Sequence, residues 1–420
     1  MAKPQIRFHT RREFLKSGLA MVAATATVPT FLSRTFLELA APVADTAARG
    51  TDERVLVVIQ LSGGNDGLNT VVPYTDDHYY RARPKLAVPP DKVLRLNDTI
   101  GLHPTLSPLK ALYDDGELAV LQGIGYPNPD RSHFRSMEIW QSGVAEDFST
   151  DGWIGRLFDH ACSNRHLPKP CSPTLGVSVD ATLNPAMKGS SAIGIALNDP
   201  ERFYRMTRLH ARSSARRPTA TASDVEESPL DFLRRTAMNA QLSADRIRDA
   251  VRGVRHSVEY PQNPFARSLE LIAGLIAGGM DTKVYYTSLT GFDTHANQRG
   301  AHERLLKMLA DGIAAFQTDL AALGQADRVV AFTFSEFGRR VAENGSGGTD
   351  HGQAAPLFIF GAPVKPGVIG KHPSLASLNR GDLAFHTDFR RVYATLIDQW
   401  LGINSGPVLK QEFERLPFLA

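Results

Sequence analysis

Four short polar segments of this 420-residue chain combine carboxylate, imidazole and amide side chains of the kind that bind divalent cations. They are Asn65-Asp66, Asp293-Thr294-His295, Ser335-Glu336 and Asp350-His351. The first three each follow an apolar segment of strand length, and the fourth lies in a Gly-rich loop. Because the carboxyl ends of parallel strands meet at one sheet edge, we expect these segments to converge there. The predicted metal ligands are Asp66, Asp293, His295, Glu336, His351 and Asp350, the last either as a ligand or as a partner that orients His351.

Charge is the physical reason to expect a cation at this edge. Crowded carboxylates raise each other's pKa unless a cation or protons compensate their charge. Asp293 and His295 are two residues apart, so an extended chain directs both side chains to one side. Gly345, Gly347 and Gly348 allow the fourth segment to bend back toward the same ion. These donors suit Zn, Mn, Fe, Mg or Ca, and the sequence does not choose among them.

The elements that position these residues alternate along the chain. Apolar, β-branched segments predict strands at 55–61, 118–124, 283–289, 328–334 and 357–360. Helix-like segments occur at 104–114, from Asp130 or Ser132 to about Gly143, and at 263–279, 302–323 and 387–401. This alternation predicts an α/β three-layer sandwich in which a mainly parallel sheet is covered on both faces.

The region 145–265 differs in composition from the rest of the chain. It contains Pro-rich and Ala/Ser/Arg/Thr-rich pieces, a flexible stretch at 212–228 and a helix signal that begins at Ser228-Pro229. We interpret it as an inserted cap region between a first core part, 49–144, and a second core part, 266–420. Cys162 and Cys171, the only cysteines, could close a small disulfide or remain free buried thiols.

Residues 1–48 have the features of an export signal. Thr10-Arg11-Arg12-Glu13-Phe14-Leu15-Lys16 resembles the twin-arginine signal, and an apolar run from Gly18 to Leu32 follows it. That run is shorter than the roughly 20 residues a membrane span needs, although a short amphipathic helix or a membrane anchor is the alternative. We therefore expect the twin-arginine translocase as a partner during export, a periplasmic or secreted protein, and no stable span in the mature chain.

Composition excludes several other classes of protein. With 42% apolar and 22% charged residues, the chain is typical of a globular protein and not of a disordered, collagenous, coiled-coil or polytopic membrane protein. A net charge of +3 is too small for a surface that grips phosphates, so we expect no nucleic-acid partner.

Several motifs together resemble one bacterial family. The leader, LSGGNDGLN, RSHFRSMEIWQSG, FDTHANQ, SEFGRR, GSGGTDHG and the closing HTDFRRVYATLIDQWLG are similar to domain-of-unknown-function family 1501. That family resembles the alkaline phosphatase and sulfatase superfamily, whose members hydrolyse or transfer phosphate and sulfate esters at a two-metal site. The resemblance implies an alkaline-phosphatase-like fold with a divalent metal cofactor (Zn, Mn, Mg or Ca).

The resemblance also implies roles for individual residues. Asp66 would hold the second metal, and Asp293, His295 and His351 the first. Glu336 stands where an Asp-His pair completes the second site, but its neighbour is Phe337, whose ring cannot ligate. The second metal therefore loses a ligand, recruits Asn65 or Asp350, or is absent.

The superfamily's nucleophile lies at the start of the helix that follows the second strand. Asp130-Arg131-Ser132-His133 occupies that place here. The resemblance implies that Ser132 is the nucleophile and that Arg131 or His133 holds the nonbridging oxygens of the ester. An ordinary helix N-cap at Ser132 is the alternative.

These observations predict an exported metal-dependent hydrolase that acts on phosphate or sulfate esters. Its substrate would be a small-molecule ester, and the cap at 145–265 would select the alcohol portion. The alternative is a non-catalytic secreted binding or assembly protein that keeps the alkaline-phosphatase-like fold, which Phe337 favours.

Overall fold

The computed structural model describes residues 54–163, 172, 174–190, 194–214 and 243–420. The predicted signal peptide, Cys171 and the predicted helix start at Ser228-Pro229 lie outside the described residues. Two compact units are present: one contains the described residues 199–214 and 243–249, and the other contains the rest. No helix in the described part of the chain is long and apolar enough to cross a membrane.

Within the described residues of the larger unit, nine strands form a central sheet in the order β11-β5-β10-β9-β1-β8-β6-β7, with β12 paired to β5. The strands are β1 (Val55–Ser62), β5 (Leu118–Gly125), β6 (Gly176–Ser178), β7 (Ile195–Ala196), β8 (Val284–Thr290), β9 (Val329–Phe334), β10 (Ala355–Phe360), β11 (Gly367–Ile369) and β12 (Thr387–Asp388). Only β10 runs antiparallel to its neighbours, β5 and β9. The prediction of a mainly parallel sheet is confirmed.

Strand β1 lies between two parallel partners, and this position explains its sequence. Val57 pairs with Tyr285 of β8 on one side and with Ala331 of β9 on the other. Its first seven residues are buried and only Ser62 is partly exposed. A strand covered on both faces needs apolar side chains at successive positions. Polar side chains are therefore expected where the strand leaves the covered sheet, at its carboxyl end.

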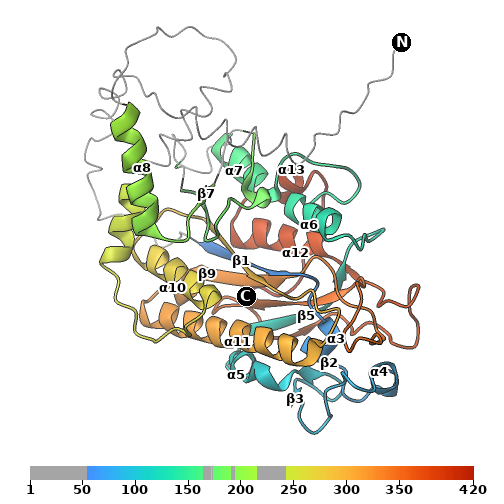
Figure 1. Ribbon diagram of the computed structural model, residues 1–420. Coiled ribbons are helices and arrows are strands. Elements are labelled where there is room, and N and C mark those ends of the chain that lie inside the picture. Colours follow the sequence, from blue (N-terminus) through green and yellow to red (C-terminus); the bar gives the residue numbers. More distant parts are fainter. Residues whose placement is uncertain (1–53, 164–171, 173, 191–193, 215–242) are drawn as a thin grey trace, which may run out of the picture. The chain divides into compact units, whose positions relative to one another are not determined.

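Helices cover both faces of the sheet (Figure 1). Helices α5 (Ser107–Asp114), α10 (Pro264–Ala277) and α11 (Gln298–Ala322) lie on one face. Helices α6 (His133–Ser142), α7 (Trp153–Ser163), α12 (Phe389–Thr395) and α13 (Ser405–Leu409), with the π-helical turn η4 (Leu396–Trp400), lie on the other. The predicted three-layer sandwich is therefore confirmed.

Short elements complete the described structure. In the larger unit they are η1 (Pro104–Leu106), η2 (Pro185–Met187), η3 (Ala326–Arg328), α3 (Gly67–Thr70), α4 (Asp77–Ala82) and a small sheet of β2 (Val71–Val72), β4 (Gly101–Leu102) and β3 (Leu94–Arg95). The smaller unit contains α8 (Pro200–Ser214), and residues 243–252 are also helical.

The separate unit is narrower than the predicted cap of 145–265. Helix α7 and strands β6 and β7 belong to the larger unit: the apolar side chains of α7 join its core, and β6 and β7 extend its central sheet beside β8. Trp153, Leu157 and Phe158 pack in the same cluster as Leu56 and Val58 of β1. Cys162, at the end of α7, is disulfide-bonded.

Trp140 anchors α6, the helix that begins at His133 with Ser132 as its N-cap. Its indole stacks on Phe389 and Phe334, with ring centroids 4.2 and 5.0 Å away. We expect Trp140→Ala to lower the free energy of unfolding by about 3–5 kcal/mol because it opens a cavity in this core. Phe134→Ala, on the same helix but 86% exposed, is the control and should change it by less than about 0.5 kcal/mol. Equal losses in chemical denaturation would contradict this account of the core.

Candidate metal centre

The candidate centre forms where loops leave the carboxyl ends of β8 and β9. Asp293 and His295 follow β8, Glu336 follows β9, and His351 lies in the loop before β10. His133 is the first residue of α6. Most of the side chains that the sequence analysis selected therefore do meet at one edge of the sheet.

Four side-chain atoms converge in this centre. Asp293 Oδ1 lies 3.0 Å from His295 Nε2, 3.2 Å from His351 Nε2 and 3.5 Å from His133 Nε2. His295 Nε2 and His351 Nε2 are 2.9 Å apart. Ligands at zinc–nitrogen distances of ~2.0–2.1 Å in a tetrahedron are separated by roughly 3.3–3.4 Å. The donor atoms of His133, Asp293 and His351 all lie within 4.8 Å of one another, so these three residues could hold a metal ion, and His295 lies beside them. His133, predicted as catalytic, is thus among the candidate metal ligands.

The other ring nitrogen of each histidine explains why these atoms point inward. Each Nδ1 faces an oxygen that can only accept: Glu336 Oε1 at 2.8 Å for His133, Asp350 Oδ1 at 3.1 Å for His295 and the Arg131 carbonyl at 2.8 Å for His351. A proton on Nδ1 leaves the lone pair of a neutral imidazole on Nε2. His133 Nε2 is buried without a hydrogen-bond partner among the described residues. Histidines of a metal site typically donate their other ring N–H to such acceptors, and the group His133, Asp293 and His351 has this arrangement.

Arg339 fixes the carboxylate of Asp293 from the other side. This buried guanidinium donates to Asp293 Oδ1 at 2.7 Å and to the carbonyls of Gly64 at 2.6 Å and Thr349 at 2.8 Å. Burial alone would raise the pKa of Asp293, but the hydrogen bond and charge of Arg339 counter it, and this pKa is lowered to about 2. Asp293 is therefore anionic at neutral pH. Sequence analysis missed Arg339, although it lies in the SEFGRR segment directly after the third polar cluster.

Protons and a cation compete for the histidines of the centre. The hydrogen bond to Glu336 raises the pKa of His133, whereas burial lowers the pKa of His351. A ligating imidazole must be neutral, so acid weakens metal binding by protonating the same Nε2 atoms.

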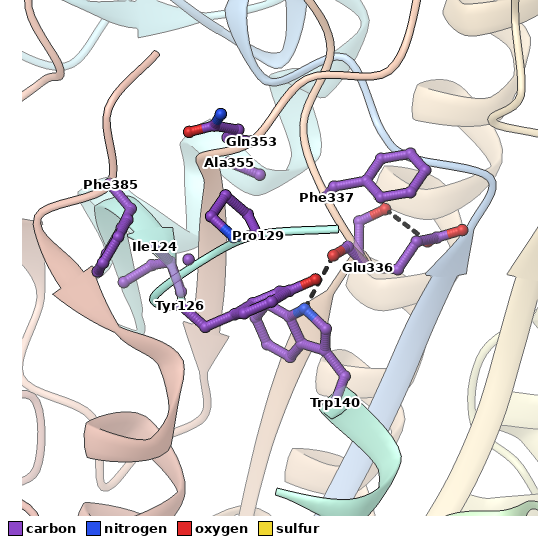
Figure 2. Close-up of a pocket in the computed structure, with 11 residues that line it drawn as sticks. Ile124, Tyr126, Pro129, Trp140, Glu336, Phe337, Gln353, Ala355 and Phe385 are labelled. Carbon is purple, nitrogen blue, oxygen red and sulfur yellow. Dashed lines mark hydrogen bonds between the residues drawn. The ribbon is translucent and has the colours of Figure 1, made fainter. Parts of the chain in front are cut away.

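Glu336 supports the centre through His133. Its Oε1 accepts from His133 and from the Gly63 N–H at 2.9 Å, and its Oε2 accepts from Ser335 at 3.2 Å. Its carbonyl accepts from the Trp140 indole at 2.9 Å, as Figure 2 shows. A cavity of about 10 Å³, roughly the space for one water, lies beside it. Glu336 is thus observed as a partner of a ligand, and direct ligation by Glu336 stays a prediction.

Asp66 lies in a different, fully buried group. Arg83 donates to its Oδ2 at 2.6 Å, Gln298 donates to the same oxygen, and both charged side chains are 0% exposed. Burial would raise the pKa of Asp66, but the charge and hydrogen bond of Arg83 hold it below its usual value. A guanidinium therefore compensates the carboxylate that the resemblance assigns to a second metal. No sequence signal pointed to Arg83, which lies at the end of α4.

Phe337 occupies one side of the centre. Its ring centroid lies 4.9 Å from that of His133 and 4.7 Å from that of His351. The resemblance implies a histidine ligand at this position. The phenylalanine that is present packs instead against two histidines of the candidate centre.

Ser132 and Arg131 begin α6 beside the centre. Ser132 is the exposed N-cap, but its hydroxyl makes no capping hydrogen bond, and its N–H donates to Asp130 at 2.6 Å. The Arg131 guanidinium pairs with the buried carboxylate of Asp382. The catalytic roles of Ser132 and Arg131 stay predictions.

An open pocket of about 450 Å³ adjoins the centre. His133, Asp293 and Glu336 are among its lining residues. Its size is within the range of small-molecule sites, ~300–1,000 Å³.

Comparisons with known proteins identify a family. Residues 53–410 match the family model described as a protein of unknown function, DUF1501. A search of curated proteins finds no match. Similar solved structures include a sulfatase from Pseudoalteromonas sp. (TM-score 0.37, 12% identity, 86% of this chain and 70% of that chain) and a protein in the alkaline phosphatase superfamily from Vibrio parahaemolyticus (0.39, 8%, 86% and 69%). A phosphonate monoester hydrolase of Agrobacterium radiobacter is another (0.35, 8%, 87% and 79%). At such low TM-scores and identities, these likenesses assign no activity to this chain.

The first prediction for this site concerns metal binding. Asp293→Ala and His351→Ala each remove a donor atom, so elemental analysis should find that both lose the bound metal. Glu336→Gln keeps the shape but weakens the support of His133, and we expect it to lower metal affinity by about 10-fold to 100-fold in a chelator competition. His78→Ala, an exposed histidine paired with Asp76, is the control. Unchanged metal content in Asp293→Ala would exclude that residue as a ligand.

The second prediction concerns the buried Asp66–Arg83 pair. Arg83→Met leaves a buried carboxylate uncompensated and should reduce the free energy of unfolding by about 3–5 kcal/mol. Asp66→Asn in the same chain removes that charge and should restore part of the loss, measured by chemical denaturation. Because the folded-state pKa of Asp66 is lowered, the wild type should lose this contribution as the pH falls below about 4. A stable Arg83→Met single variant would show that another cation compensates Asp66.

Proposed function

The chain belongs to the DUF1501 family, and from the geometry of its candidate centre we propose that it is an exported metal-dependent hydrolase of phosphate or sulfate esters. One observation carries this proposal: donor atoms of His133, Asp293 and His351 lie close enough together to share an ion, and His133 and Asp293 line an open pocket. A substrate can therefore reach the place where the donor atoms meet.

The donors of His133, His351 and Asp293 fit a single divalent cation, with His295 beside them. Such a cation would supply positive charge that polarises an ester oxygen. The imidazole donors favour Zn or another transition metal over Mg or Ca, which prefer oxygen. The Arg339 guanidinium keeps Asp293 ionised and oriented, and Glu336 keeps the Nε2 lone pair of His133 directed at the centre.

The start of α6 provides the other elements of an ester site. Its ten residues begin at His133, so the first N–H groups and the helix dipole favour an anion near Ser132. Ser132 is the proposed nucleophile, and its exposed hydroxyl is not used in capping. Arg131 is the less favoured group for holding nonbridging oxygens because its guanidinium already pairs with Asp382.

Export rests on the sequence alone. The twin-arginine segment at 10–16 supports passage through the twin-arginine translocase and a periplasmic or secreted location. A zinc-like cofactor inserted during folding in the cytoplasm would be compatible with that route.

A non-catalytic binding or assembly protein is the second candidate, and Phe337 favours it. The phenyl ring packs on two ligand histidines where a second metal's ligand is expected, so a remaining single ion could serve stability only. Turnover separates the two candidates.

The test is an ester panel assayed on the purified mature protein. With Zn, Mn, Mg or Ca added in turn, we expect turnover of p-nitrophenyl phosphate or p-nitrophenyl sulfate that Asp293→Ala abolishes. Ser132→Ala should lower kcat on the order of a thousandfold or more without loss of metal. Retained turnover in Ser132→Ala would move the nucleophile elsewhere, and no turnover with any ester and metal would favour the binding protein.

A further inference from the structure

The pocket beside the candidate centre has two distinct walls. One is a face of α6 formed by Phe134, Met137 and Gln141, which recur at helical spacing. The other is the carboxyl end of β1, with Gln60 and Ser62. The residues of these two walls are not candidate metal ligands, so the proposed metal site gives them no role.

The Gln60 amide has one orientation because its neighbours fix it. The Ala186 N–H donates to Asn184 Oδ1 at 2.9 Å, so the Asn184 amide presents its NH₂ group to Gln60. Asn184 Nδ2 and the Tyr286 hydroxyl both donate to Gln60 Oε1. A flipped Gln60 would place its own NH₂ against these donors. Its NH₂ group therefore faces Ser62, to whose Oγ it donates at 2.5 Å.

This chain of hydrogen bonds leaves Ser62 as a donor. Its oxygen already accepts from Gln60, and no described residue accepts its hydroxyl hydrogen. Gln60 Nε2 also carries a second hydrogen. The β1 wall thus offers the rotatable hydroxyl of Ser62 and the second amide hydrogen of Gln60, which is 8% exposed, as donors to acceptor oxygens of a ligand in the pocket.

The α6 wall offers an aromatic ring. Phe134 is 86% exposed, although large apolar side chains on this face of the sheet are otherwise mostly buried. Met137 lies one turn further along α6 and is partly exposed. An open ring and a thioether favour the apolar face of a ring-shaped ligand.

The charges of the residues that line the pocket restrict the chemical class of the ligand further. Asp293 and Glu336 are acidic, and none of the described lining residues is Lys or Arg. A polyphosphate or other polyanionic alcohol portion would find no cation along these walls. The ligand that matches donors on one wall, an aromatic face on the other and acidic groups in the lining is neutral, ring-shaped and rich in hydroxyl oxygens.

We propose that Gln60, Ser62 and Phe134 form a binding site for a neutral polyhydroxylated ring, a pyranose saccharide, beside the metal centre. A pyranose has hydroxyl oxygens at its edge for Gln60 and Ser62 and a C–H face for Phe134. A simple aryl alcohol could stack on Phe134, but it brings one acceptor oxygen where a pyranose brings several. The identification of this saccharide as the alcohol portion of an ester rests on the proposed function, whereas its binding does not.

Binding is tested without turnover by saturation-transfer NMR on the full mature chain. The probes are methyl α-D-glucopyranoside and methyl β-D-galactopyranoside, with benzyl alcohol as the aryl comparison. We expect at least one pyranoside to bind more tightly than benzyl alcohol. Phe134→Ala and Ser62→Ala should each weaken that binding by about 3-fold to 10-fold. Phe148→Ala, a 75% exposed phenylalanine outside the pocket lining, is the matched control and should leave it unchanged.

The outcomes separate this inference from the proposed function. Pyranosides that bind no better than benzyl alcohol, or whose binding survives both pocket substitutions, would overturn the saccharide site even if p-nitrophenyl esters are hydrolysed. Pyranoside binding that depends on Phe134 and Ser62 supports the site even if no ester is hydrolysed, and the hydrolase proposal would then fail alone. Where both hold, glucose 6-phosphate or glucose 6-sulfate should be preferred over the phenyl ester in kcat/KM, and Phe134→Ala should reduce that preference.

Discussion

The centre of this protein depends on the charge of one carboxylate oxygen. Asp293 Oδ1 is approached by three imidazole nitrogens and by the buried guanidinium of Arg339. A carboxylate oxygen has too few lone pairs to accept hydrogen bonds from all four of these groups. The histidines also carry their protons on Nδ1, so each Nε2 turns a lone pair instead of a donor toward Asp293. A shared cation resolves this conflict, which is why the structure supports a metal more strongly than any single residue type did.

The order of the strands in the sheet places the loops that carry these side chains next to one another. Strands β8, β1 and β9 are adjacent and parallel, so the segments after them leave the same edge. Helix α6, in the helical layer with α7, α12 and α13, then contributes His133, and a hydrogen bond to Glu336 fixes the ring of that histidine. The same edge carries the polar end of β1, so the centre and its pocket share one rigid wall.

Two carboxylates after neighbouring strands are neutralised in different ways. Asp66 is enclosed with Arg83 and shows no exposure, whereas Asp293 remains nearly half exposed and faces histidines. A buried ion pair of that kind needs no metal, although the unpaired Asp66 Oδ1 has no partner among the described residues. The geometry consequently fits one cation better than the two metal ions that the resemblance implies. Phe337, whose ring cannot ligate, also argues against a second ion.

Apolar periodicity and strand-end polarity are local properties, so the sequence alone predicted β1, β5, β8, β9 and β10, helices α5, α6, α10, α11 and α12, and the types of residue at the sheet edge. It predicted neither the shorter strands β6, β7, β11 and β12 nor helix α7. It placed the start of α6 at Asp130 or Ser132, of which Ser132 is the observed N-cap, and it put the start of α11 at His302 instead of Gln298. Only the tertiary structure brought His133 together with Asp293 and His351, paired Arg83 with Asp66 and oriented the amide of Gln60. Those outcomes depend on contacts between residues as far apart as His133 and Glu336, 203 positions in the chain, and no local pattern encodes such distances.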